Sequence, residues 1–99
     1  MSVLVSIRFT GDVGKFRSLM ESDPDRFRKI ADQAKQVGAI HHQFAVGDGV
    51  VLVQDEWETA EAFQGFFSDP QIGAIVAESG ATGEPEVWIA QAIDSPDRF

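Results

Sequence analysis

Four segments of the chain are rich in the apolar and β-branched residues that are typical of β-strands. Asp48-Gly49 separates the second of these segments from the third, and Asp-Gly between two apolar runs is a strong signal for a hairpin turn. The predicted strands are residues 3–9, 39–46, 50–57 and 86–93.

The segments between these strands carry apolar residues at helical spacing. After the first strand, Asp12 can cap a short helix, and Asp23 with Pro24 can begin a second, because proline at the first helical position loses no hydrogen bond. After the hairpin, Thr59 can cap a third helix, and "SDP" at 68–70 can begin a fourth. The apolar positions expected to be buried are Phe16, Leu19, Met20, Phe27, Ile30, Ala31 and Ala34 in the first pair, and Ala62, Phe63, Phe66, Phe67, Ile72, Ile75 and Val76 in the second.

The order of these elements is β-α-β-β-α-β, with each α standing for a helical segment that restarts once. It predicts an α+β fold of the ferredoxin-like type, in which an antiparallel sheet is covered by helices on one face. With 99 residues the chain forms a single domain, 1–99, and "DSPDRF" at 94–99 reads as a C-terminal tail.

Both faces of the predicted sheet carry apolar side chains. In the first strand Val5 and Ile7 share one face while Leu4 lies on the other, and Leu52 and Trp88 repeat this on later strands. A face exposed to solvent should instead carry polar residues in alternation. Since the helices can cover only one face, a second copy of the chain is the simplest cover, and we expect a two-fold homodimer in which two sheets face each other.

Composition and charge narrow the classes of partner. The formal net charge of −8 argues against nucleic acid and anionic membranes as partners. The absence of cysteine excludes disulfides and thiolate chemistry. No apolar run is long enough for a membrane span, and the start of the chain lacks the basic leader of a secretory signal, so we expect a cytoplasmic protein.

The two histidines of the chain are adjacent in "GAIHHQF", residues 38–44. Neighbouring residues of a strand point to opposite faces, so His41 and His42 cannot serve one site within a subunit. The face of His42 is the more apolar one and is assigned to the helices; it includes Ile40, Phe44 and Val46. The face of His41 is assigned to the dimer partner; it includes Ala39, Gln43 and Ala45.

The length of the hairpin turn decides what lies opposite His42. A two-residue turn at Asp48-Gly49 places His42 opposite Asp55 and His41 opposite Glu56. A three-residue "GDG" loop would instead place Gln54 opposite His42. A carboxylate beside an imidazole orients the ring and fixes its tautomer, which is the arrangement of a general base. The alternative is a half-buried histidine that is satisfied by a carboxylate or a carbonyl and has no chemical role. No third ligand is spaced for a metal, so no metal is expected.

Aromatic side chains surround this predicted pair. In a protein with a pocket they would form its walls; without one they would fill the core. The residues expected to line a pocket are Phe44, Trp57, Phe63, Phe66 and Trp88.

The stretch "VVLVQDEWETAEAFQGFFSDPQIGAIV", residues 50–76, carries a resemblance to a known family. It resembles the dimeric α+β barrel superfamily, in particular the antibiotic-biosynthesis-monooxygenase-like domains. Their members typically show an acidic residue and a tryptophan at a strand end, then a helix that starts with Ser/Thr-Glu-Ala, then Ser-x-Pro before a second helix. "DEWETAEAF" and "SDP" fit this pattern, and the "IHH" strand is similar to that of a group of small actinobacterial proteins.

The resemblance implies a homodimer and, for some members, cofactor-free oxygenation of aromatic polyketides. Many members carry a histidine on the helix at the position of Phe66, and some use it to bind haem. This chain lacks it, so we expect neither haem degradation nor any other cofactor.

Three functions remain open. The first is an enzyme, a cofactor-independent monooxygenase or isomerase acting on a small apolar or aromatic molecule, with His42 as base and Asp55 as its orienting partner. The second is a non-catalytic hydrophobic-ligand-binding or stress-related accessory protein. The third is a structural dimer with no pocket, whose core is filled by the eight phenylalanines.

Overall fold

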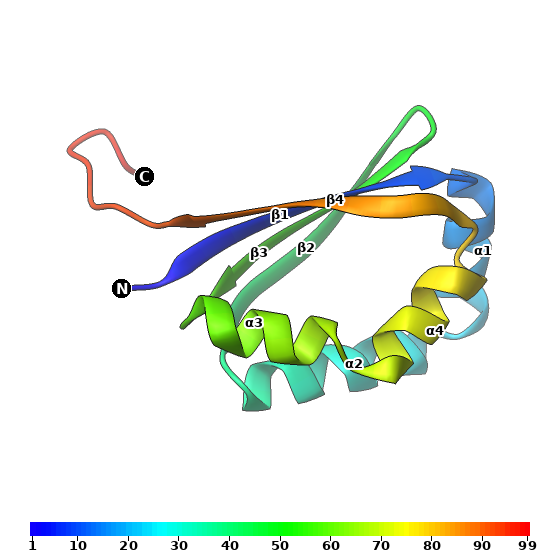
Figure 1. Ribbon diagram of the computed structural model, residues 1–99. Helices are drawn as coiled ribbons and strands as arrows, with labels where there is room; N and C mark the ends of the chain where they lie inside the picture. Colours follow the sequence, from blue (N-terminus) through cyan, green and yellow to red (C-terminus); the bar gives the residue numbers. More distant parts are fainter.

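A four-stranded antiparallel sheet forms one layer of the protein and four helices form the other (Figure 1). The computed structural model describes residues 1–99. Along the sheet the strands are ordered β2-β3-β1-β4. In chain order the elements are β1 (Val3–Gly11), α1 (Val13–Ser22), α2 (Pro24–Gln36), β2 (Ala39–Gly47), β3 (Val50–Trp57), α3 (Ala60–Phe67), α4 (Pro70–Glu78) and β4 (Ala81–Gln91). This confirms the predicted ferredoxin-like α+β fold.

Three of the four predicted caps begin their helices with a side-chain hydrogen bond. Asp12 accepts from the backbone N–H of Lys15, and Thr59 accepts from that of Ala62. Asp69 likewise caps α4, with Pro70 in its first turn. Asp23 precedes α2 as predicted but makes no capping hydrogen bond, so Pro24 provides the local signal for that helix.

The last strand begins five residues earlier than its apolar pattern predicts. Residues 81–85 were expected in a loop, but Ala81 and Thr82 pair with Gly11 and Thr10 at the end of β1. The pairing of β1 with β4 shifts register between Arg8 and Thr10, where residues 83–85 of β4 lie opposite Phe9 alone. The segment "ATGEP" contains residues that are typical of turns, so its sequence does not predict a strand. It is a strand because it pairs with β1, which the preferences of its own residues do not reveal.

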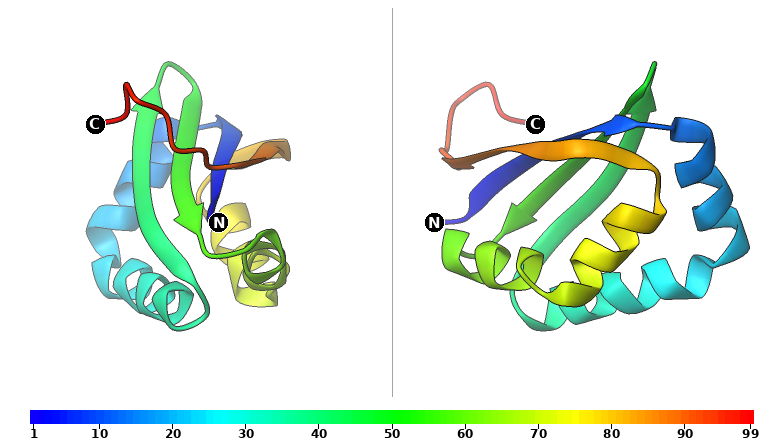
Figure 2. Two further views of the ribbon diagram at one scale, coloured as in Figure 1. Left: turned by 90° about the vertical axis from the view of Figure 1, so that its left-hand side faces the viewer. Right: turned by 45° about the vertical axis from the view of Figure 1, so that its right-hand side comes forward.

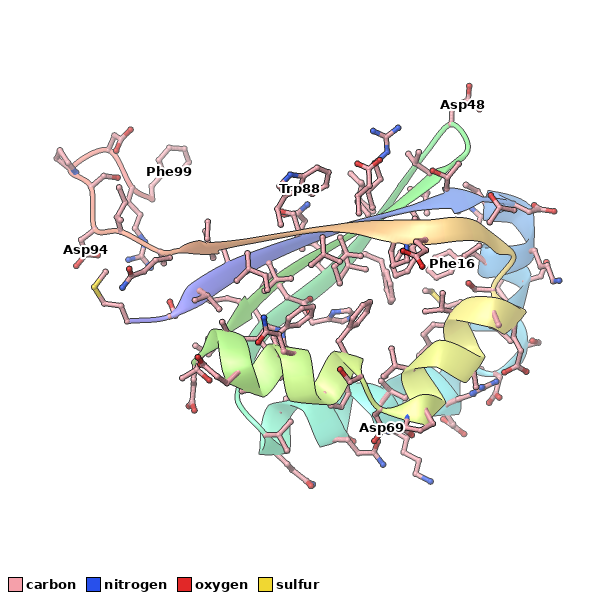
Figure 3. All side chains as sticks on the ribbon, in the orientation of Figure 1. Phe16, Asp48, Asp69, Trp88, Asp94 and Phe99 are labelled. Carbon is pink, nitrogen blue, oxygen red and sulfur yellow. The ribbon has the colours of Figure 1, made fainter.

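The core lies between the sheet and the helices. Val5, Ile7 and Val53 from the sheet pack with Trp57 and with the helix residues Ala34 and Phe63. The opposite face of the sheet has no helix on it, and the labelled Trp88 projects from that face away from the helices (Figure 3). The predicted assignment of Val5 and Ile7 to one face and Leu4 to the other is confirmed, since the first two are buried and Leu4 is exposed.

The helices form two pairs beneath the sheet. In the left view of Figure 2, α1 and α2 lie beneath the edge of the sheet that ends in β2, and α3 and α4 lie beneath the other side. None of the helices is long and apolar enough to span a bilayer.

Gly11 lies where the chain leaves the sheet and passes the start of β4. A Cβ at Gly11 would overlap the carbonyl oxygen of Gly80 and lie 2.9 Å from Cα of Ala81. The same carbonyl accepts a hydrogen bond from the N–H of Asp12. This close approach of two backbones requires glycine.

Gly11→Ala is therefore expected to destabilise the fold by about 1–3 kcal/mol, because the backbone of β4 has to move away. Gly65→Ala is the matched control, since Gly65 lies within α3 and nothing lies within 4 Å of an added Cβ. It should be neutral or stabilise by up to about 1 kcal/mol. Urea denaturation followed by far-ultraviolet circular dichroism measures both, and equal effects of the two variants would contradict the prediction.

Candidate functional site

The hairpin between β2 and β3 has a two-residue turn, and this sets the register of the candidate site. Gly47 pairs with Val50, His42 with Asp55 and His41 with Glu56, as predicted. The alternative with Gln54 opposite His42 is wrong, because Gln54 pairs with Gln43. His42 and Asp55 thus lie side by side on the face of the sheet that the helices cover.

His42 and Asp55 are joined by a hydrogen bond of 2.7 Å between Nδ1 of the ring and Oδ1 of the carboxyl group. The other oxygen, Oδ2, accepts a hydrogen bond of 3.0 Å from Nε1 of Trp57. The Asp55 side chain is only 8% exposed, whereas that of His42 is 39% exposed. The carboxyl group is therefore held from two sides inside the protein, and the imidazole reaches from it toward solvent.

The hydrogen-bonding chemistry assigns the roles of the ring nitrogens. A carboxylate oxygen only accepts, so Nδ1 of His42 carries the proton and donates it to Asp55. In the neutral ring, Nε2 then carries the free lone pair. A histidine held in this tautomer by a carboxylate can act as a general base toward a molecule placed at Nε2.

One part of the predicted face assignment on β2 is wrong. The register shifts between Ala39 and His41, so that Ala39 pairs with Trp57 and Ile40 is an extra residue. Ala39 consequently packs against the core, although it was assigned to the partner face, and Ile40 is exposed, although it was assigned to the helices. A β-bulge of this kind reverses the alternation of the strand locally.

Aromatic rings connect the His42 ring to the helices. Phe44, two residues along β2, meets it edge to face at a centroid distance of 4.8 Å. Phe44 also packs edge to face against Phe16 of α1 at 5.1 Å and Phe27 of α2 at 6.1 Å. Phe16 lies between the sheet and the helices (Figure 3). These rings build a wall beside the His42–Asp55 pair.

A cavity of about 370 Å³ lies between the sheet and the helices and includes both members of the pair in its lining. Of the 23 residues that line it, 19 are hydrophobic, and the four others are Arg28, His42, Asp55 and Ser79. This volume is within the range of sites that bind small molecules. The alternative of a completely filled core is therefore wrong.

Four of the five predicted pocket aromatics line this cavity: Phe44, Trp57, Phe63 and Phe66. Trp88 does not line it, and this correction follows from strand alternation. Trp88 pairs with Ser6 on the open face of the sheet, and 55% of the residue is exposed.

The sequence did not predict that several residues of α1 and α2 line the cavity. Phe16 and Phe27 were predicted as core residues, and the helical stripe that placed them inside also brings them to the cavity. Arg28 was not singled out, because it flanks that stripe. No cluster of three or more histidine, cysteine, aspartate or glutamate residues is arranged to hold a metal ion.

Two polar contacts join the helix pairs beneath the cavity. Arg26 of α2 forms an ion pair with Glu78 of α4, and Nε2 of Gln71 in α4 donates to Oε1 of Gln33 in α2. The hydrogen bond from Arg26 lowers the pKa of the Glu78 carboxyl group below its ordinary value and raises that of Arg26. These contacts identify the side of α2 that faces α4.

Comparison with known proteins supports the fold. No model of a known protein family matches the sequence, and no curated protein matches it significantly. SnoaB, a cofactor-independent oxygenase from Streptomyces nogalater, is 18% identical with a TM-score of 0.66, and the match covers 98% of each chain. ActVA-Orf6 of Streptomyces coelicolor, a monooxygenase solved with nanaomycin D, is 16% identical with a TM-score of 0.70 over 99% of this chain and 93% of the other. Rv0793 from Mycobacterium tuberculosis is 15% identical with a TM-score of 0.66, over 98% and 100%. The chain thus has the fold of antibiotic-biosynthesis-monooxygenase-like proteins.

Proposed function

We propose that the chain is a homodimeric, cofactor-independent monooxygenase-like enzyme that acts on a small, apolar, ring-containing molecule. The observation that carries this proposal is the hydrogen-bonded His42–Asp55 pair in the lining of an otherwise apolar cavity. An isolated polar pair among apolar residues can react with one part of a bound molecule, while the apolar lining only contacts the rest of that molecule.

The shape and lining of the cavity favour a ring system as substrate. Trp57 packs against Phe63 and Phe66 at centroid distances of 5.7 and 5.5 Å, and all three line the cavity. Flat aromatic walls offer large apolar contacts to a planar molecule. Two solved proteins of this fold are described as an oxygenase and as a monooxygenase with a bound ligand, which supports the same class of activity here.

In this proposal His42 starts the reaction by removing a proton. Nε2 takes it from an activated C–H, or from a hydroxyl group conjugated to that carbon, and Asp55 stabilises the imidazolium that forms. The electron-rich anion then reduces O₂, the co-reactant. Overall, R₂CH₂ and O₂ give R₂C=O and H₂O: the carbon loses four electrons, one oxygen atom enters the product, and the other leaves as water with the two hydrogens.

Oxygen consumption by the purified protein tests this function directly. The substrates are hydroxylated two- and three-ring aromatic compounds with an activated CH₂ group, and product formation is followed by mass spectrometry. The proposal expects consumption by the wild type that depends on His42. Tight binding of these compounds without any consumption would contradict it and would favour the ligand-binding alternative.

The open face of the sheet supports the homodimer. Leu4 and Trp88 are large, exposed and apolar, and they lie on the face that no helix covers. Exposed apolar patches of this kind are typical of protein–protein contacts. A second copy placed on this face would bury both residues and would leave the cavity between sheet and helices accessible.

Trp88→Glu is expected to weaken dimer formation by about 30-fold or more, since a buried interface tryptophan commonly contributes about 2 kcal/mol or more. The monomer should keep its fold, because Trp88 makes no contribution to the core. Val37→Glu is the control, an exposed apolar position after the end of α2. Sedimentation equilibrium measures the dissociation constants, and a wild type that is monomeric at micromolar concentration would contradict the dimer.

A further inference from the structure

The orientation of α2 places Arg28 at an open edge of the cavity. Arg26 and Gln33 mark the side of α2 that faces α4. With a turn of about 100° per residue, Arg28 is rotated by about 200° from Arg26 and about 140° from Gln33. It therefore points away from α4. In the left view of Figure 2, the side of α2 that is turned away from α4 is the one at the β2 edge of the sheet.

Arg28 lies on the same stretch of that edge as His42 and Phe44. The chain turns between α2 and β2 at residues 37–38. Arg28 lies eight residues before the last residue of α2, about 12 Å at the helical rise. Because Ile40 is an extra residue, His42 lies only two steps of the ladder after Ala39, about 7 Å at the strand rise. The contact between Phe27 and Phe44 supports this alignment. Phe27 directly precedes Arg28 on α2, and Phe44 lies two residues after His42 on β2.

Both side chains line the cavity and both reach solvent. The Arg28 side chain is 71% exposed, and His42 is exposed on an edge strand that has no further neighbour. Arg28, a largely exposed lining residue, therefore lies at an opening of the cavity on the α2 side, and the half-exposed His42 lines the cavity from β2.

Arg28 is the only lysine or arginine in the lining of the cavity. Its ion pair is with Asp25, 2.8 Å away and 91% exposed, three residues earlier on the same helix. A surface pair of this kind contributes little and can be exchanged for another anion. Farther along the same flank, Lys35 lies 3.9 Å from Asp32 and has its own exposed partner.

Among the other polar residues of the lining, only His42 has a ring nitrogen, Nε2, without a hydrogen-bond partner in the protein. Both oxygens of Asp55 already accept hydrogen bonds, and the hydroxyl group of Ser79 donates to the carbonyl of Val76. A charged group placed deeper in the cavity would lose its hydration without a partner, which is costly. Arg28 is therefore the one permanently charged partner that the lining offers to an anionic group of a ligand.

We infer that the cavity binds an apolar ring system carrying one anionic group, such as a carboxylate or sulfonate, and that Arg28 binds this group at the opening. Arg28 then sets specificity and orientation, because it fixes the charged end outside and directs the apolar end past His42 toward Trp57. The inference deepens the proposed function by naming the ligand class, and it rests on that proposal only in requiring that the ligand occupy this cavity.

Two fluorescent probes with the same aromatic body test the inference. Anilinonaphthalene sulfonate is anionic and phenylnaphthylamine is uncharged, and titration of each gives a dissociation constant without any turnover. The inference expects Arg28→Gln to weaken binding of the sulfonate by about three- to fivefold and to change binding of the uncharged probe less than twofold. Lys29→Gln is the matched control, because Lys29 is the next residue on α2 and does not line the cavity.

A cavity-filling variant shows where the probes bind. Ala31 lines the cavity, so Ala31→Phe should weaken both probes together. The inference is overturned if Arg28→Gln affects both probes equally, affects neither, or matches Lys29→Gln, or if Ala31→Phe leaves binding unchanged. If Arg28→Gln selectively loses binding of the sulfonate but the wild type consumes no oxygen, the inference is supported and the proposed catalysis is contradicted. The inference and the proposed function can therefore fail separately.

Discussion

His42→Ala is expected to lower kcat by a factor of about 100 to 10,000, the range that a positioned general base contributes. The expectation follows from the 2.7 Å hydrogen bond to Asp55, which holds Nδ1 and leaves Nε2 free at the cavity. Substrate binding should change little, because the aromatic walls that provide most of the contact area remain. A loss in kcat with a nearly constant dissociation constant is the signature of a group that acts on the reacting atoms.

His41→Ala is the matched control for this prediction. It removes the same side chain one residue away, and His41 points to the opposite face of the sheet and pairs with Glu56. Oxygen uptake gives kcat, and quenching of the fluorescence of Trp57 in the cavity gives substrate affinity. His42→Gln should behave like His42→Ala in turnover while retaining binding. Unchanged turnover in both His42 variants would refute the general-base role.

The register of the candidate pair could be predicted from the sequence because two local rules determine it. Asp48-Gly49 favours a two-residue turn, and a strand alternates its side chains with a period of two. Counting back from the turn then places His42 opposite Asp55. The prediction succeeded because the ladder is regular between the turn and the pair.

Beyond the pair, the same counting fails where the ladder is irregular. The bulge at Ile40 lies between the pair and the end of α2, where Gly38 accepts a hydrogen bond from the N–H of Glu58. No residue type in "GAIHH" requires a bulge, and its position follows from how the tight turn after α2 joins the end of β3. Ala39 and Ile40 therefore exchange faces of the sheet because of a tertiary effect, which the local sequence pattern does not predict.

The two tryptophans show which part of a site the sequence leaves open. Alternation places Trp88 on the other face from Val87 and Ile89 and so away from the helices, but the sequence does not say whether a cavity remains between the helices and the sheet. That depends on how far the helices lie from the sheet, which is set by the packing of rings such as Phe16 and Phe27. Arg28 was missed for a related reason, since a charged residue beside an apolar stripe is usually only solvated.

Trp57→Ala is expected to destabilise the fold by about 3–5 kcal/mol, the usual cost of removing a fully buried tryptophan. Trp57 is 1% exposed and contacts Phe63 and Phe66 within the core. A small domain has a free energy of unfolding of about 5–15 kcal/mol, so this loss could leave a large fraction of the chain unfolded. Urea denaturation at a fixed protein concentration is the measurement, because dimer formation would make the midpoint depend on concentration.

Trp57→Phe separates the hydrogen bond from the packing. Phenylalanine keeps most of the ring contacts but removes the N–H that binds Oδ2 of Asp55, and a buried acceptor left without its donor costs about 1–3 kcal/mol. Trp88→Phe is the same substitution at a tryptophan outside the core, and in the monomer it should cost less than about 0.5 kcal/mol. Equal losses in the two variants would show that the bond to Asp55 contributes nothing to stability. Since that bond also helps to hold the carboxyl group that orients His42, Trp57→Phe should lower kcat as well, whereas a purely structural tryptophan would change stability alone.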